Sequence, residues 1–84
     1  MTTATVKLYA SLSRYLPPGA RQNTIELALP EGATVMSVLD RLKVPEVQCH
    51  LLLVNGIFVA PSRRAGLLVE NGDTIAVWPP VAGG

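Results

Sequence analysis

The sequence has little of what most enzymes need. It contains one cysteine, Cys49, and one histidine, His50. A lone cysteine cannot close an intrachain disulfide, which is typical of proteins in a reducing compartment. The two residues are adjacent, and neighbouring side chains on a strand point to opposite faces, so we do not expect a catalytic Cys–His pair. No cluster of His, Cys, Asp and Glu has metal-ligand spacing, and no glycine-rich loop matches a nucleotide-binding motif. A self-contained active site is therefore not expected.

Charge and long apolar runs are also scarce. Only 15% of the 84 residues are charged and the formal net charge is +1, so the composition encodes no basic surface for nucleic acid. Apolar runs such as residues 51–54 are far shorter than the roughly 20 residues of a membrane-spanning helix. The first residues lack the features of a secretory signal. With 49% apolar residues, the chain is predicted to be one small folded domain, cytoplasmic and without membrane contact.

Alternation of polar and apolar residues predicts two strands in the first third of the chain, over residues 5–11 and 24–29. About 12 residues separate them, which is too many for a two-residue hairpin, so we expect a wide loop with room for a turn of helix. The residues predicted to face the core are Val6, Leu8 and Ala10 in the first strand and Ile25, Leu27 and Leu29 in the second.

The period of the apolar residues changes to that of a helix after Thr34. We expect Thr34 to cap the helix, without a full capping box because Ser37 stands where Glu or Gln is usual. The helix should be about ten residues long and end before Pro45, and a helix of that length needs a sheet to pack on. Its apolar stripe consists of Val35, Val38, Leu39 and Leu42.

The clearest local signal is Asn55-Gly56 between two apolar runs, which predicts a β-hairpin over residues 51–60 with a type I′ turn. A two-residue loop pairs Val54 with Ile57. Because side chains alternate along a strand, one face of the hairpin should carry Leu52, Val54, Ile57 and Val59, and the other Leu51, Leu53, Phe58 and Ala60.

A last strand is predicted over residues 74–78, after a turn at 71–73, with Ile75 and Val77 facing the core and Pro79-Pro80 ending the pairing. The order strand, strand, helix, strand, strand, strand indicates an α+β fold. We predict a β-grasp, in which a five-stranded mixed sheet wraps one main helix and the last strand lies beside the first. Residues 1–78 would form the domain and residues 79–84 an extended tail.

One helix can cover only one face of this sheet. The opposite face is predicted to carry an apolar cluster, which on a soluble protein usually marks a partner-binding surface. The alternative is that a loop or the N-terminal segment covers the cluster. Nearby, Arg63-Arg64 is interpreted as part of a solvated loop, or else as a contact for an acidic partner. The predicted docking residues are Leu53, Phe58, Ala76 and Trp78, with Tyr9 beside them.

The last six residues, Pro-Pro-Val-Ala-Gly-Gly, are the most informative segment. The proline pair favours an extended exit from the last strand, and six residues can span about 20 Å. Because the sequence ends at Gly84, we expect its carboxylate to be the reactive group. An ionised carboxylate resists nucleophilic attack until it is activated, for example as an acyl-adenylate. The alternative is a disordered glycine tail without a role.

Together, these motifs resemble the MoaD/ThiS family of ubiquitin-like sulfur carriers over nearly the whole chain. The Pro-Pro-Val-x-Gly-Gly ending is most similar to that of molybdopterin synthase small subunits. The resemblance implies a β-grasp fold and a C-terminal glycine that an ATP-dependent, ubiquitin-activating-like enzyme adenylates before its conversion to a thiocarboxylate. The matching segments are residues 6–10, 32–35, 54–56, 71–75 and 79–84.

The resemblance also implies roles for individual residues. Gly84 would carry the sulfur, and Gly83, Ala82 and Val81 would form the arm that enters a partner. No cofactor would be bound by the protein itself, because ATP is used by the activating enzyme. The implied partners are that enzyme, a sulfurtransferase, and the large subunit of molybdopterin synthase or another sulfur-accepting enzyme. There the tail would give sulfur to cyclic pyranopterin monophosphate in molybdenum cofactor biosynthesis, while the catalytic side chains belong to the partners.

Three alternatives remain open. The same chemistry could deliver sulfur for thiamine, cysteine or another thio-metabolite. The chain could be a ubiquitin-like modifier whose Gly84 becomes amide-linked to a lysine. It could also be a plain binding module that uses only its apolar sheet face and has an inert tail.

Overall fold

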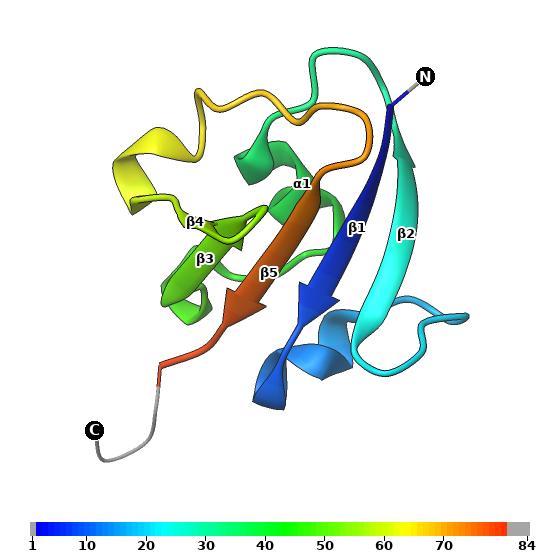
Figure 1. Ribbon diagram of the computed structural model, residues 1–84. Helices are drawn as coiled ribbons and strands as arrows, with labels where there is room; N and C mark the ends of the chain where they lie inside the picture. The colour runs from blue at the N-terminus through cyan, green and yellow to red at the C-terminus, as the bar shows by residue number, and fades with distance from the viewer. Residues whose placement is uncertain (1, 81–84) are drawn as a thin grey trace.

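The structure is a computed structural model that describes residues 2–80, and it contains one mixed β-sheet with an α-helix against one face (Figure 1). Short 3-10 helices lie in the connections. The elements in chain order are β1 (Thr2–Leu8), η1 (Ala10–Tyr15), β2 (Thr24–Leu29), α1 (Val35–Arg41), η2 (Glu46–Gln48), β3 (Leu51–Val54), β4 (Ile57–Phe58), η3 (Pro61–Arg63) and β5 (Thr74–Trp78).

The five strands lie in the order β2-β1-β5-β3-β4, so the last strand is in the middle of the sheet. β5 runs parallel to β1 and antiparallel to β3. In Figure 1, α1 lies behind the sheet, and the face turned toward the viewer has no helix on it. This arrangement is the β-grasp fold, and the predicted position of the last strand beside the first is confirmed.

The core lies between the sheet and α1. The inward residues of the two central strands, Val6 and Leu8 in β1 and Ile75 and Val77 in β5, are completely buried. The stripe of α1 packs on them as predicted, with Leu42 only partly buried. In β2, an edge strand, Leu29 is buried, whereas Ile25 and Leu27 are half-buried and pack against the rim of the core.

The first strand differs from its predicted bounds. β1 begins at Thr2 and ends at Leu8, and Ala10 is exposed instead of facing the core. Ala10 has a φ of 52°, which turns the chain into η1, the helical turn expected in this loop. Leu12 of η1 is fully buried and fills the space that a longer strand would have filled.

The N-terminus of α1 is capped more completely than predicted. The backbone N–H of Ser37 donates to Thr34 Oγ1 (3.1 Å), and the N–H of Thr34 donates to Ser37 Oγ (2.8 Å). The expectation that Ser37 could not complete a capping box was wrong. A serine hydroxyl is short, but it accepts the Thr34 N–H as a glutamate side chain would.

The helix is also shorter than predicted, and Pro45 does not end it. Lys43 has a φ of 62°, its N–H donates to the carbonyl of Asp40 (3.0 Å), and the N–H of Val44 donates to that of Leu39 (3.0 Å). These two bonds form a Schellman motif, in which a residue with left-handed backbone closes the helix. α1 therefore has seven residues.

The predicted hairpin is confirmed in its register. Val54 pairs with Ile57, and both Asn55 (φ 53°) and Gly56 (φ 83°) have the positive φ values of a type I′ turn. The side chain of Asn55 also holds the hairpin to the start of β5, because its amide donates to Asp73 Oδ1 (2.8 Å) and its oxygen accepts the N–H of Thr74 (2.9 Å). The second strand of the hairpin is short, since β4 contains only residues 57–58.

Arg64 does not lie on a solvated loop, so this interpretation was wrong. Its side chain is completely buried. Nη1 donates to the carbonyl of Cys49 (2.9 Å), Nε donates to that of Val59 (3.4 Å), and the Arg64 carbonyl accepts the N–H of Met36 in α1 (3.0 Å). Arg64 thus joins the segment before β3, the end of the hairpin and the first turn of α1. Its Nη2 has no hydrogen-bond partner among residues 2–80.

We predict that Arg64→Ala lowers the free energy of unfolding by about 3 kcal/mol, because two buried carbonyls lose their donor and a cavity forms. The neighbouring Arg63 is exposed, so Arg63→Ala should change stability by less than about 0.5 kcal/mol. Urea unfolding followed by circular dichroism measures both values. Equal stabilities of the two variants would contradict the structural role of Arg64.

Candidate functional site

The end of β5 fixes where the C-terminal tail leaves the domain. Tyr9 donates its N–H to the carbonyl of Val77 (3.1 Å), and His50 donates its N–H to that of Trp78 (3.0 Å), so the last residues of β5 are held from both sides. Pro79 follows and is buried, whereas Pro80 is exposed. In Figure 1, β5 ends at the lower edge of the sheet, away from the hairpin turn. The predicted tail residues Val81, Ala82, Gly83 and Gly84 lie outside the described residues.

The predicted docking residues come together on the face of the sheet opposite α1. Leu53 pairs with Ala76 of β5 on one side and with Phe58 of β4 on the other, so these three form a row across the sheet. Phe58 is 52% exposed, and the other two are half-buried. Trp78 lies in the next row and pairs with Leu51, a further exposed apolar residue. We call this group, residues 51, 53, 58, 76 and 78, the open-face cluster.

Tyr9, which follows the end of β1, extends the open-face cluster toward the β1 side of the sheet. Its ring stacks on the Trp78 indole with a centroid distance of 4.6 Å and an interplanar angle of 9°. Stacked aromatic pairs add to the free energy of area burial, so the indole is held flat at the point where the tail begins. The aromatic surface and the start of the tail are therefore adjacent.

The segments that could have covered this face lie elsewhere. Residues 2–8 form β1 itself. The connection from β4 to β5 passes on the α1 side, where the carbonyl of Leu67 accepts the N–H of Val35 (2.9 Å) and Val69 donates to the carbonyl of Ala33 (2.9 Å). Within residues 2–80, neither candidate covers the open-face cluster.

Sequence reasoning missed Lys7, which lies in the same row as the cluster. Lys7 pairs with Ala76 of β5 and with Thr24 of β2, and its side chain is half-buried. The alternation in β1 that turns Val6 and Leu8 inward places Lys7 and Tyr9 on the opposite face. The cluster therefore has a cation on its β1 side.

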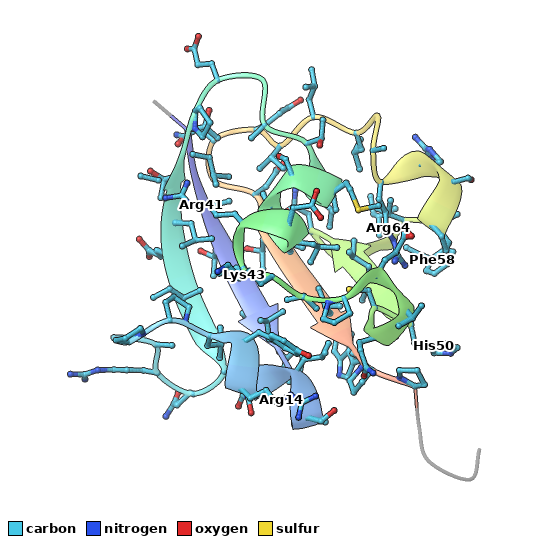
Figure 2. The ribbon with its side chains drawn as sticks, turned by 180° about the vertical axis from the view of Figure 1, so that it is seen from behind. Arg14, Arg41, Lys43, His50, Phe58 and Arg64 are labelled. Carbon is cyan, nitrogen blue, oxygen red and sulfur yellow. The ribbon has the colours of Figure 1, made fainter. Side chains whose placement is uncertain are left out.

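Cys49 and His50 do not form a reactive pair, as predicted. Cys49 is buried and its Sγ lies 3.5 Å from the carbonyl oxygen of Pro45, whereas His50 is exposed and projects from the surface (Figure 2). Burial raises the pKa of the Cys49 thiol; the Arg64 guanidinium opposes this shift, and Glu46 adds to it. A protonated, buried thiol is a poor nucleophile.

The described part of the chain contains no metal-binding group. No set of three or more His, Cys, Asp and Glu side chains in residues 2–80 is arranged to hold a metal ion. No helix in these residues is long and apolar enough to cross a membrane. What the described surface offers is an aromatic patch on the open face of the sheet, at the point where β5 ends.

The family model described as Mut7-C ubiquitin matches residues 1–83. Among curated proteins, none matches the chain. Several solved structures share its fold, among them three described in turn. The small archaeal modifier protein 1 of Haloferax volcanii is 26% identical, with 98% of this chain and 99% of that chain covered and a TM-score of 0.68. The protein of the same name from Methanosarcina acetivorans is 26% identical, with 100% and 98% covered and a TM-score of 0.66.

The third is a putative molybdopterin converting factor, subunit 1, from Pyrococcus furiosus, which is 24% identical, with 96% of this chain and 100% of that chain covered and a TM-score of 0.69. These structures match the chain over nearly its full length, and they confirm the resemblance to ubiquitin-like proteins of the MoaD type. Together with the family match over residues 1–83, they show that the chain is a ubiquitin-like β-grasp protein that belongs to the Mut7-C ubiquitin family.

Proposed function

We propose that the protein is a sulfur carrier whose C-terminal Gly84 is adenylated and converted to a thiocarboxylate, and that it acts as the small subunit of a molybdopterin synthase. The observation that carries this proposal is that the open-face cluster lies beside Pro79, where the segment that leads to Gly83-Gly84 begins. Both Tyr9 and Trp78 lie where the tail begins, so a partner that binds the cluster also lies beside the start of the tail.

The chemistry needs only the terminal carboxylate from this chain. The activating enzyme transfers the AMP part of ATP to the Gly84 carboxylate, with release of pyrophosphate. Hydrosulfide, supplied by way of a sulfurtransferase, then attacks the acyl carbon: the C–S bond forms, the bond from that carbon to the oxygen of AMP breaks, AMP leaves, and loss of the sulfur-bound proton gives a thiocarboxylate. Gly83 and Gly84 leave the carbonyl open to attack because they have no side chain.

The likeness to a putative molybdopterin converting factor, subunit 1, supports the choice of molybdopterin as the product. In that role the tail enters the large subunit and gives its sulfur to cyclic pyranopterin monophosphate. Delivery of sulfur for thiamine, cysteine or another thio-metabolite would use the same activated tail. The molybdopterin role is therefore distinguished from these roles by identifying the acceptor enzyme that binds the protein.

A second candidate function is that of a protein modifier, which the likeness to two archaeal modifier proteins favours. In this case a lysine amine displaces AMP from the activated Gly84, and an amide bond to the target protein forms. Intact mass spectrometry of the protein co-expressed with its activating enzyme distinguishes the two. A gain of about 16 Da, from replacement of oxygen by sulfur, indicates a thiocarboxylate, whereas a mass added to other proteins indicates conjugation.

We predict that one residue added after Gly84 abolishes the sulfur-dependent mass gain and leaves thermal unfolding unchanged, because the reactive carboxylate becomes part of a peptide bond. The matched control is an alanine inserted between Met1 and Thr2, before β1, which should load normally. Mass spectrometry of both proteins after incubation with activating enzyme, ATP and a sulfur source provides the measurement. Full loading of the untrimmed, extended protein would disprove the role of Gly84.

We also predict that Phe58→Glu and Trp78→Ala weaken binding to the activating enzyme by about thirty-fold each, since each removes an aromatic contact from the open-face cluster. Val47 is exposed in η2, outside the cluster, so Val47→Glu should bind normally. Calorimetric titration gives the affinities, and thermal unfolding shows whether each variant is folded. If both cluster variants bind as tightly as Val47→Glu, the cluster is not a docking surface.

A further inference from the structure

The edge strand β4 has backbone groups that the sheet does not use. Val54 and Ile57 close the two-residue turn, and Val59 donates its N–H to the carbonyl of Leu52 (2.9 Å). Hydrogen-bonded and non-hydrogen-bonded pairs alternate in an antiparallel ladder. The intervening pair, Leu53 and Phe58, is therefore non-hydrogen-bonded, and the N–H and C=O of Phe58 point away from β3 to the open edge.

A groove of about 280 Å³ runs along this edge. Residues 54–59 of the hairpin form one wall, and the connection between β4 and β5 forms the other. The far wall is held in place, because its Leu67 carbonyl accepts the N–H of Val35 and Leu68 forms a bridge with Thr34. At the base of this connection, the buried Arg64 donates to the carbonyl of Val59, the residue after Phe58 (3.4 Å). The groove is thus formed before any partner arrives.

Exposed apolar side chains gather at the groove. In residues 2–80, Ile57 (70% exposed), Leu68 (59%) and Phe58 are three of the five large apolar residues that are exposed, and all three line it. An exposed apolar edge strand is a template for pairing with another chain. Isolated apolar residues on a surface need no explanation, but a group of them beside unpaired backbone groups does.

The two ends of the groove carry opposite charges. Arg63 lies at the end where β4 leaves the sheet, and Glu70 lies at the end near the hairpin turn. Asp73 is also at the turn end, but its two carboxylate oxygens already accept the Asn55 amide and the N–H of Glu70 (2.8 Å each). Both donors are neutral, so Asp73 keeps its charge; the turn end therefore carries two carboxylates, Glu70 and Asp73, and the other end carries Arg63.

We propose that this groove binds an extended segment of a partner protein, which adds a sixth strand to the sheet at β4. Backbone bonds to Phe58 hold the segment, and branched aliphatic side chains at alternate positions fill the space between Ile57 and Leu68. The segment carries an acidic residue beside Arg63 and a basic residue beside Glu70. The groove lies at the edge of the sheet and needs no part of the tail, so this binding is independent of the proposed sulfur chemistry.

A phage-displayed library of linear random peptides, selected on the full-length protein, tests the proposal. The enriched peptides should alternate aliphatic with polar residues and carry opposite charges at their two ends. The best peptide, labelled with fluorescein, is then measured by fluorescence anisotropy. Methylation of its backbone nitrogen that faces β4 should weaken binding at least about ten-fold, whereas methylation of the next nitrogen, which faces solvent, should not. Both peptides have the same side chains, and the protein is unchanged.

Variants of the protein test the charged ends. Arg63→Glu should weaken binding of the peptide about five-fold, and replacing the acidic residue of the peptide by lysine should restore it. Glu31→Arg, an exposed charge change away from the groove, is the control and should have no effect. Failure to enrich any peptide, equal binding of the two methylated peptides, or binding that is insensitive to Arg63→Glu would each overturn the proposal, and none of these results would depend on sulfur loading.

Discussion

The parallel pairing of β5 with β1 is the contact on which the other features of this protein depend. It buries Val6 and Leu8 against Ile75 and Val77, and none of these four side chains is exposed. The strand that ends at Trp78 is thereby the only one bonded to both β1 and β3. Detachment of β5 would break its hydrogen bonds to both β1 and β3, so the start of the tail is anchored to the centre of the sheet. The proposed carrier function would benefit from such a fixed base.

The same pairing explains the position of Arg64. Because β4 is at the edge and β5 is in the centre, the chain must return across the α1 side of β3 between these strands. This connection has almost no regular structure to satisfy its backbone. The buried guanidinium ties it instead to its surroundings by bonds to the carbonyls of Cys49 and Val59, and the Arg64 carbonyl accepts the N–H of Met36. Burial of a cation without a carboxylate is unfavourable unless hydrogen bonds compensate for it. The held connection also forms the far wall of the β4 groove.

The described residues form two distinct candidate binding surfaces, the open-face cluster and the β4 groove. The open-face cluster faces away from α1 and lies beside the start of the tail, whereas the groove follows the β4 edge. Phe58 belongs to both, because its ring lies on the open face and its peptide groups point to the edge. A partner bound at the cluster and a strand bound in the groove would therefore be neighbours on the assembled protein, and the proposed sulfur transfer would take place at the other end of the tail.

Local patterns in the sequence determined most of the fold. The alternation in β1 and β5, the stripe of α1 and the Asn55-Gly56 turn each depend on neighbours a few residues apart, and they were enough to place Phe58 and Trp78 on one face. Tertiary structure decided the rest. Ala10 leaves the sheet because Leu12 fills the core. The end of the helix was missed for a different reason: the motif at Lys43 is local, but a lysine gives no sequence signal for the positive φ that it adopts there. Arg64 is buried because the carbonyls of Cys49 and Val59 both accept hydrogen bonds from its guanidinium. No pattern in the sequence indicates that these two carbonyls lie beside it. A charged residue at a loop position gives no sign of this, since the partners that make its burial possible meet only in the folded chain.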